Sequence, residues 1–442
     1  EMYYYRWWSL RKHIKETPVG YGMTEFLVQR SYSDKYNLIA CAIGHHIYES
    51  RWLRDPKYLD QIIHTWYRGN DGGPMKKMDK MDKFSSWNAD AVLARYMVDG
   101  DKDFMLDMTK DLETEYQRWE RTNRLKNGLY WQGDVQDGME ESISGGRKKK
   151  YARPTINSYM YGNAKALSIM GILSGDEGMA MRYGMRAATL KSLVENDLWN
   201  TRHQFFETMR SDSSANVREA IGYIPWYFNL PDTTKKYEVA WKEIMDEKGF
   251  SAPYGLTTAE RRHPEFRTRG VGKCEWDGAI WPFASAQTLT AMANFMNNYP
   301  QTVLSDSVYF RQMELYVESQ YHRGRPYIGE YLDEVTGYWL KGDQERSRYY
   351  NHSTFNDLMI TGLIGLRPRL DDTIEINPLI PADKWDWFCL DNVLYHGHNL
   401  TILWDKNGDR YHCGKGLRIF VNGKEAGHAD TLTRLVCENA LK

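Results

Sequence analysis

The chain has 442 residues, and its 58 Lys and Arg nearly balance its 59 Asp and Glu. This balance excludes a strongly basic nucleic-acid-binding surface as the organising feature, and without an apolar run of about 18 residues we expect no membrane span. Five widely spaced cysteines with no C-x-x-C pair indicate neither a metal site nor a disulfide framework, and we expect no cofactor. The 16 Trp and 31 Tyr exceed what a core requires and suit a ligand pocket.

Helical periodicity dominates the chain up to about residue 365. The segment between Pro56 and Gly69 is typical, because apolar residues recur in it at i, i+3, i+4, i+7 and i+8. We find no repeat of fixed period, so a closed arrangement is favoured over a solenoid. Antiparallel pairs of helices predict a mainly α fold, an (α/α)6 toroid of six hairpins. The predicted helical segments lie near residues 3–16, 37–50, 56–68, 84–98, 101–122, 156–173, 176–198, 219–227, 236–247, 281–297, 305–320 and 355–365.

The pattern changes near Pro368, where short β-branched and alternating runs replace the helical stripes. Asn407-Gly408 and Asn422-Gly423 fall between or beside these runs and predict tight hairpin turns. We therefore predict two domains, a catalytic barrel over residues 1–368 and a small antiparallel β module over residues 369–442. The β module either packs on the barrel or completes a β-sandwich with strands outside this chain.

Three loops between predicted helices combine carboxylates with tryptophan and glycine: residues 129–142, 274–282 and 327–339. Hydrolysis of a glycosidic bond needs two carboxyl groups on opposite sides of the sugar, together with stacking faces and hydrogen-bonding edges. The loops supply these groups. The chain has no phosphate-binding, HExxH zinc or nucleophile-elbow motif. Residue types alone leave carbohydrate chemistry and a generic aromatic-rich helical protein equally open.

The acid-rich loops resemble those of the six-hairpin glycosidase clan that includes trehalase and the mannosyl-oligosaccharide glucosidases of glycoside hydrolase family 63. Residues 137–140, D-G-M-E, stand where the clan has its S/D-G-M/W/R-D loop. Residues 330–337 keep the spacing of the clan's E-N-Y-N-P-x-T-G segment. Residues 276–281, W-D-G-A-I-W, are similar to W-R-G-P-V-W, with Asp277 in place of arginine. The resemblance extends in order over residues 35–365.

This resemblance implies an exo-acting glycoside hydrolase that works by inversion on an oligosaccharide or a polysaccharide side chain. Glu140 takes the position of the general acid and Glu330 that of the general base. Their neighbours Glu141, Asp137 and Glu334 stay open as alternative catalytic residues. The expected sugar contacts are aromatic or hydrogen-bonding side chains from the same loops and nearby helix ends: His45, His46, Trp87, Asn88, Trp131, Gln132, Asp134, Asn157, Tyr159, Trp276, Asp277, Trp281, Asn351 and His352.

Two other classes remain open from the sequence. The first is a polysaccharide lyase or sugar epimerase of the same architecture, which would transfer protons through His or Tyr side chains. The second is a carbohydrate-binding protein without catalysis. The sugar is also open, since α-glucosides, α-mannosides, L-rhamnose and L-arabinose all suit such a pocket. The resemblance implies an extracellular or periplasmic location, and the start at Glu1 suggests a processed form or a piece of a longer chain.

Overall fold

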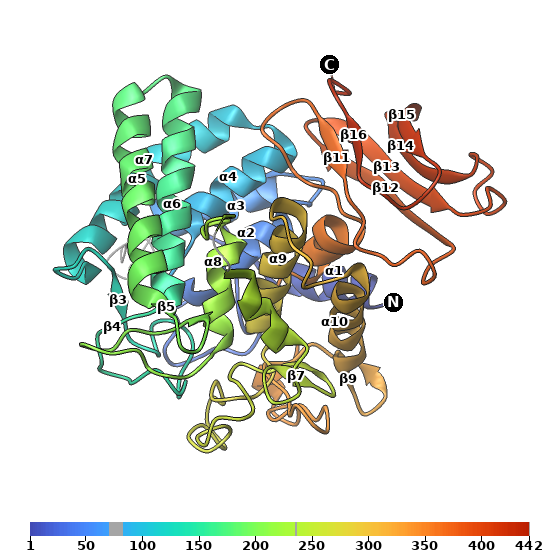
Figure 1. Cartoon of the computed structure of the whole chain (residues 1–442). Helices are drawn as coiled ribbons and strands as arrows, with labels where there is room; N and C mark the ends of the chain where they lie inside the picture. The colour runs from blue at the N-terminus through green and yellow to red at the C-terminus, as the bar shows by residue number, and fades with distance from the viewer. Residues whose placement is uncertain (70–82, 235–236, 442) are drawn as a thin grey trace.

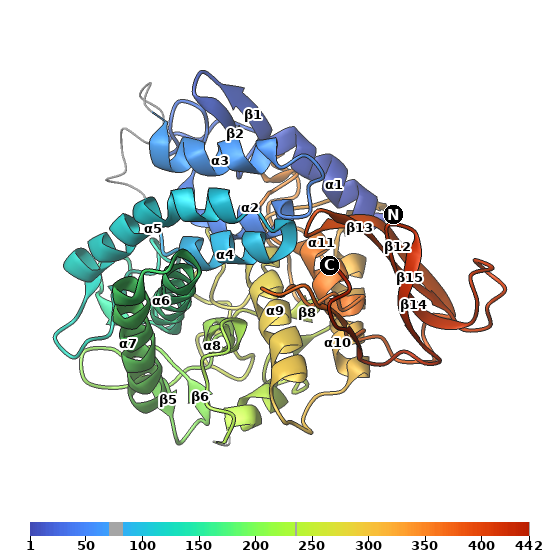
Figure 2. The same ribbon diagram turned by 90° about the horizontal axis from the view of Figure 1, so that it is seen from above.

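The computed structural model describes residues 1–69, 83–234 and 237–441, and its helical part is a ring of two layers (Figures 1 and 2). Each inner helix contacts the next, and the last contacts the first. The predicted (α/α)6 toroid is therefore confirmed. The inner ring consists of α2 (Ile43–Ser50), α4 (Asn88–Asp99), α6 (Pro154–Ser174), α8 (Ile224–Tyr227), α9 (Pro282–Asn298) and α11 (Phe355–Leu358).

An outer layer of helices surrounds this ring (Figure 2). Most outer helices are longer than their inner partners, and one is a 3-10 helix. The helical segment predicted at 236–247 corresponds to this 3-10 helix, and its first residue, 236, lies outside the described residues. The outer layer consists of α1 (Met2–His13), α3 (Lys57–Arg68), α5 (Lys102–Asn123), α7 (Glu177–Leu193), η5 (Tyr237–Ile244) and α10 (Asp306–Ser319). Within the described part of the chain, no helix is long and apolar enough to cross a membrane.

Two helical hairpins show how the sequence sets the ends of the helices. Helix α4 ends at Gly100, whose φ of 73° is left-handed, and α6 ends in the same way at Gly175, with a φ of 79°. Glycine adopts this conformation without a steric penalty. The next residues, Asp101 and Asp176, cap α5 and α7 by accepting a hydrogen bond from the backbone N–H three residues on. Outer helices therefore follow inner ones after tight turns.

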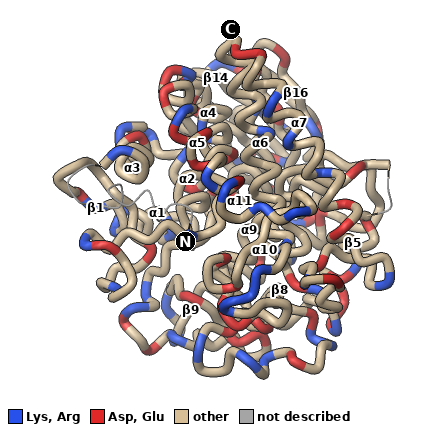
Figure 3. Tube along the Cα trace, turned by 90° about the vertical axis from the view of Figure 1, so that its left-hand side faces the viewer, with Lys and Arg blue, Asp and Glu red and all other residues tan. Residues whose placement is uncertain are grey.

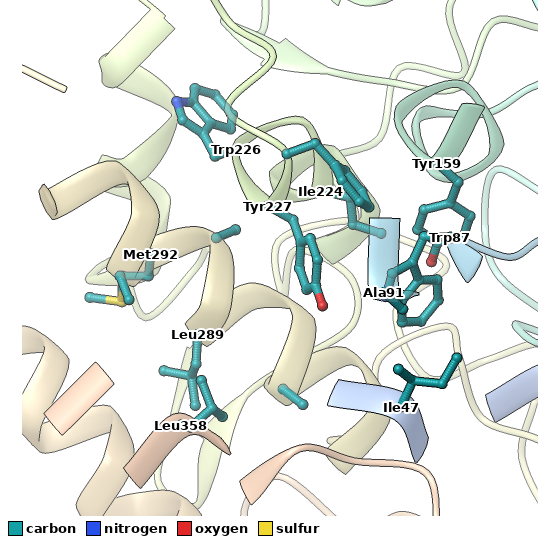
Figure 4. Packing of buried hydrophobic residues seen from close by; sticks show 14 of the residues in the cluster. Ile47, Trp87, Ala91, Tyr159, Ile224, Trp226, Tyr227, Leu289, Met292 and Leu358 are labelled. Atoms are coloured by element: carbon teal, nitrogen blue, oxygen red, sulfur yellow. The ribbon is translucent and has the colours of Figure 1, made fainter. Parts of the chain in front are cut away.

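The axis of the ring is filled by side chains from the inner helices (Figure 4). Trp87, which precedes α4, is fully buried, and its ring centroid lies 4.7 Å from that of Tyr159 on α6. Gly44 on α2 allows this packing, because a Cβ at that position would lie only 2.2 Å from Cε2 of Trp87. Ile47, Tyr227 and Leu289 add side chains from α2, α8 and α9 to the same core (Figure 4). This packing closes the centre of the barrel.

A buried ion pair and its hydrogen bonds tie the first helices of the ring to the last. Arg6 of α1 donates to Glu49 of α2 over 2.9 Å and to Oδ1 of Asn351 over 2.8 Å. The carboxylate of Glu49 in turn accepts the backbone N–H groups of Asn356 and Asp357, at the start of α11. The side chains of Arg6 and Glu49 are at most 1% exposed. Charges this deeply buried need partners of this kind, so polar residues help to specify the closure of the ring.

Short antiparallel hairpins connect the helices, and several lie at one end of the barrel, at the bottom of Figure 1. Acidic residues concentrate near β8 and β9 at this end (Figure 3). The loop 274–282 joins the loop 327–339 through mutual backbone hydrogen bonds of Ile280 and Leu332, both 3.0 Å. The hairpins are β1 (Ile14–Thr17) with β2 (Gly20–Met23), β3 (Trp131–Gln132) with β4 (Tyr151–Ala152), β5 (Trp199–Asn200) with β6 (Phe205–Phe206), β7 (Ser251–Ala252) with β8 (Gly255–Leu256), and β9 (Tyr321–His322) with β10 (Arg325–Pro326).

The C-terminal residues form antiparallel sheets beside the barrel (Figure 1). The module meets α4, where the backbone N–H of His396 donates to the carbonyl of Val98 over 2.7 Å. The predicted β module is confirmed, while the exact domain boundary stays a prediction. The main sheet has the order β12 (Trp387–Tyr395), β13 (His398–Asp405), β14 (Gly416–Val421), β15 (Lys424–Ala429), and a second sheet pairs β11 (Ile374–Ile376) with β16 (Leu435–Cys437).

One of the two predicted hairpin turns is wrong. Asn422-Gly423 does connect β14 to β15, with φ values of 49° and 80°. Asn407-Gly408 instead lies in the long loop 406–415, because the buried carboxylate of Asp405 gathers three backbone N–H groups of that loop. The other tight turn is His396-Gly397, between β12 and β13, with φ values of 47° and 78°.

Candidate active site

The loop that carries Glu140 is held by a buried ion pair. Asp137 accepts from Arg153 over 2.6 Å and also from the hydroxyl of Thr155, and the side chains of Asp137 and Arg153 are fully buried. Gly138 follows with a φ of 73°, and a Cβ there would lie 2.5 Å from Sγ of Cys41. A glycine is therefore required at this position, and the loop turns sharply before Glu140.

The carboxyl group of Glu140 is suited to hold a proton near neutral pH. Burial raises its pKa to about 7, and the negative charges of Glu330 and Asp134 act in the same direction. An acid that must protonate a leaving oxygen works best with a pKa near the working pH. The charge of Glu330 acts on Glu140, so the first and third acid-rich loops lie near each other.

Glu330 lies in the loop after β10 and is 4% exposed. Its Oε2 accepts from the hydroxyl of Ser347 over 3.2 Å and lies 3.3 Å from Nη1 of Arg346. Burial raises the pKa of Glu330, whereas Arg346 and Ser347 favour the charged form. A guanidinium group beside one carboxyl of the pair therefore makes the two environments different.

A third carboxyl group belongs to this cluster and was not predicted from the sequence. Glu25 follows β2, is 4% exposed, and accepts from the hydroxyl of Tyr350 over 2.5 Å. Burial raises its pKa to about 8, and the charges of Glu330 and Glu140 act in the same direction. The segment around Glu25 has no glycosidase-like motif and no helical spacing, so no sequence signal marked it.

The alternative catalytic residues are engaged in ion pairs. Glu141, at a φ of 69°, lies 3.0 Å from Arg147, and Glu334 lies 2.5 Å from Arg267. Asp137 is the internal brace of the acid loop described above. These ion pairs are shorter than the 3.3 Å between Glu330 and Arg346. They favour Glu140 and Glu330 as the reacting groups, an assignment that remains a prediction.

The predicted aromatic contacts form a stack rather than a set of open faces. Trp281 lies between Trp276 and Tyr331, with ring centroids 4.3 Å and 4.4 Å away and interplanar angles of 18° and 13°. Because its faces are occupied by these rings, Trp281 can offer a sugar only its edge. Trp131 lies apart, under the ammonium group of Lys150, which is 4.4 Å from its ring centroid.

The predicted histidines are buried, and two of them pack against aromatic rings. His45 lies edge-on to Trp87 and Phe283, with centroids 5.0 Å and 4.4 Å away. Neither ring nitrogen of His45 has a hydrogen-bond partner among the described residues. His46 forms a hydrogen bond of 2.7 Å with the carbonyl of Asn351. The ring of His352 forms a hydrogen bond with the backbone carbonyl of Glu330. Burial lowers the pKa of all three histidines, that of His46 to about 4, so their rings are neutral at pH 7.

Several predicted sugar contacts have their polar atoms engaged by the protein. Asn88 donates to the hydroxyl of Tyr67 over 3.0 Å, and Asn157 exchanges hydrogen bonds of 2.8 Å and 2.9 Å with the backbone of Tyr130. Asp277 accepts the backbone N–H groups of residues 269 and 270, at 2.6 Å and 2.9 Å. These residues hold the loops in place, and a direct contact with the sugar stays a prediction for them.

The remaining predicted contacts also have protein partners. Gln132 donates to the hydroxyl of Ser85 over 3.2 Å, and the hydroxyl of Tyr159 accepts from Gln287 over 2.6 Å. Asn351 donates to the carbonyl of Thr24 over 3.1 Å, so it fixes the segment next to Glu25. Burial raises the pKa of Asp134, and its main-chain carbonyl accepts from the N–H of Met139 inside the acid loop over 2.9 Å.

Comparison with known proteins shows the family of the domain that carries this cluster. Residues 35–353 match the model of the mannosylglycerate hydrolase MGH1-like glycoside hydrolase domain. Residues 366–428 match the model of the C-terminal domain of glycosyl hydrolase family 65. These matches do not favour the lyase, epimerase or non-catalytic alternatives.

Solved structures share the fold. One described as "Sialidase" is 99% identical to this chain with a TM-score of 0.98, and the chain spans only 40% of it. The GH63 mannosylglycerate hydrolase from Thermus thermophilus in complex with glucose has a TM-score of 0.61 at 12% identity, over 81% of this chain and 99% of that one. A GH78 family rhamnosidase from Bacillus sp. GL1 has a TM-score of 0.59 at 9% identity, over 86% of this chain and 37% of that one.

Proposed function

Since the chain belongs to the MGH1-like glycoside hydrolase family, we propose that Glu140 is its general acid and Glu330 its general base. The observation that carries this assignment is the unequal surroundings of the two carboxyl groups, of which Glu330 is buried and Glu140 is partly exposed. Burial raises the pKa of Glu330, but Arg346 at 3.3 Å and the hydroxyl of Ser347 at 3.2 Å favour its anion. Burial and the charge of Glu330 favour the protonated form of Glu140. Such a division between two carboxyl groups separates acid from base.

The proposed reaction is a single displacement with inversion. Glu140 donates its proton to the glycosidic oxygen as the bond from that oxygen to the anomeric carbon breaks. Glu330 accepts a proton from a water molecule, whose oxygen bonds to the anomeric carbon from the opposite face. Inverting enzymes keep the two carboxyl groups about 6.5–9.5 Å apart to leave room for this water. Afterwards Glu140 is charged and Glu330 protonated, and proton exchange with solvent restores both.

We also propose exo action on a terminal sugar of an oligosaccharide or a polysaccharide side chain, outside the cytoplasm. This part rests on the resemblance of the acid-rich loops to the trehalase and GH63 clan. The sugar stays open among α-glucosides, α-mannosides, L-rhamnosides and L-arabinosides. Because one solved structure is described as "Sialidase", sialosides belong in the same test.

The experiment is a hydrolysis screen over aryl glycosides and defined oligosaccharides of these classes, with NMR of the first anomer released. Inversion predicts the anomer opposite to that of the substrate. Glu140→Gln and Glu330→Gln should each lower kcat by roughly 100- to 10,000-fold. Release of the retained anomer would refute the mechanism, and near-normal turnover by Glu330→Gln would refute the assignment of the base.

Matched control variants exist within the same loops. Glu141→Gln and Glu334→Gln remove carboxylates next to the proposed pair, each ion-paired to an arginine. We expect both to keep kcat within a few-fold of the original protein. Thermal unfolding of all four variants separates a loss of chemistry from a loss of folding.

A further inference from the structure

Glu25 is fixed beside the proposed active site by two residues that lie far away in the sequence, Tyr350 and Asn351. The backbone N–H of Asn351 donates to the carbonyl of Glu25 over 2.9 Å, and its side chain donates to the carbonyl of Thr24 over 3.1 Å. The hydroxyl of Tyr350 donates to Oε1 of Glu25 over 2.5 Å. Backbone and side chain of Glu25 are therefore both held, although no regular secondary structure surrounds it.

The same residues connect Glu25 to the loop of the proposed base. The backbone N–H of Tyr350 donates to the carbonyl of Ile328 over 3.2 Å, two residues before Glu330. The ring of Tyr350 lies 3.9 Å from that of His352, which bonds to the backbone carbonyl of Glu330. The charges of Glu330 and Glu140 both act on the pKa of Glu25. Three carboxyl groups from distant segments thus share one site.

Only one oxygen of Glu25 is used by the protein. Oε1 accepts from Tyr350, whereas Oε2 accepts no hydrogen bond from any residue in the described ranges. The buried carboxylates that hold the loops have both more partners and stronger ones: Asp137 is paired with Arg153 and Thr155, and Asp277 accepts two backbone N–H groups. Glu25 has no ion pair with a described cation, and two neighbouring carboxyl groups oppose its ionisation. A neutral carboxyl group has one O–H donor and an acceptor, which matches a sugar hydroxyl.

We infer that Oε2 of Glu25 hydrogen-bonds a ring hydroxyl of the sugar bound between Glu140 and Glu330, which makes Glu25 a residue that determines specificity. This inference rests on the proposed function. Tyr350 orients the carboxyl group, and Asn351 fixes its backbone. A buried group built to bind a hydroxyl discriminates strongly against a substrate that lacks it, because the group is then left unpaired.

The test compares variants of Glu25 with a series of deoxy substrates. The substrates are the 4-nitrophenyl glycoside that the screen finds to be hydrolysed and its analogues that each lack one ring hydroxyl. Glu25→Ala should lower kcat/KM on the full sugar by roughly 10- to 100-fold. On one deoxy analogue the same variant should have almost no further effect, because the contact is already missing. Glu25→Gln should stay within a few-fold at pH 6–7, since an amide can also donate and accept.

Controls keep the inference separate from the proposed function and from folding. Glu16→Gln changes an exposed glutamate on β1 and should have no effect on any substrate. Glu25→Asp withdraws the carboxyl group by one methylene and replaces the alanine variant if that variant fails to fold. Without any substrate, infrared titration should show the C=O band of a protonated carboxyl group at pH 7 that Glu25→Gln removes.

The outcomes distinguish the hypotheses. A loss of kcat in Glu25→Gln as large as that in Glu330→Gln would overturn the inference, because Glu25 would then act as the base. An equal effect of Glu25→Ala on every deoxy analogue would overturn it too, because no single hydroxyl would be contacted. If Glu140→Gln and Glu330→Gln keep their turnover, the proposed function fails instead. If only those two lose it and Glu25→Ala does not, the inference alone fails.

Discussion

The pKa of Glu140 gives the most direct test of the proposed chemistry. At a pKa of about 7, half of the free protein carries the required proton at pH 7 and roughly one tenth at pH 8. Because kcat/KM reports the free enzyme, it should fall about tenfold per pH unit above that value. Glu140→Gln should remove this alkaline limb and lower kcat/KM by roughly 100- to 10,000-fold on a substrate with a poor leaving group.

The assay measures kcat/KM between about pH 5 and 9 for two substrates with the same sugar. One carries an alkyl leaving group, which needs a proton, and the other carries 2,4-dinitrophenolate, which does not. Glu140→Gln should therefore be much less impaired on the dinitrophenyl substrate. An equal loss on both substrates, or an alkaline limb that persists near pH 7 in Glu140→Gln, would refute the assignment of Glu140 as the acid.

Three further predictions concern the scaffold of the site. Gly44→Ala places a Cβ against Trp87, 2.2 Å from Cε2, and should lower the free energy of unfolding by about 1–3 kcal/mol in urea titrations. Asp137→Asn removes the carboxylate that pairs directly with the buried Arg153. We expect the free energy of unfolding to fall by about 3–5 kcal/mol and the Tm to fall with it, and an unchanged Tm would refute the role of Asp137 in holding the loop. Glu25 retains its proton in the folded state up to about pH 8, whereas the unfolded chain loses it near the ordinary value of 4.5. Stability should therefore fall between these pH values, by at most roughly 5 kcal/mol from this group, and Glu25→Gln should remove that difference between pH 5 and 8.

The helices could be predicted because their local signals agree with the packing. The segment predicted at 101–122 is α5 (Lys102–Asn123), and the glycine and aspartate at its start act as stop and cap. Predictions were less exact where tertiary contacts decide the conformation. Asn407-Gly408 has the sequence of a tight turn, but the buried carboxylate of Asp405 draws the chain into a wider loop.

The residues of the candidate site also differ in how far the sequence could predict them. Glu140 and Glu330 lie in segments whose order and spacing follow a known pattern, so both could be proposed from sequence. The contribution of Glu25 depends on Tyr350, which is 325 residues away along the chain. No periodicity or spacing encodes such a contact. The stacking of Trp281 between two rings was likewise invisible, because residue type does not reveal which faces of a ring are covered.

The bonds that tie Thr24 and Glu25 to Tyr350 and Asn351 also constrain when the protein can become active. During synthesis, the segment with Glu140 leaves the ribosome long before residue 351, and its hairpins can pack locally. At that stage the site still lacks Tyr350 and Asn351. Joining segments so far apart in sequence costs chain entropy, which is offset only when the last helix of the ring packs. We therefore expect a nascent chain that stops short of Tyr350 to be a partly folded, open set of helical hairpins without activity.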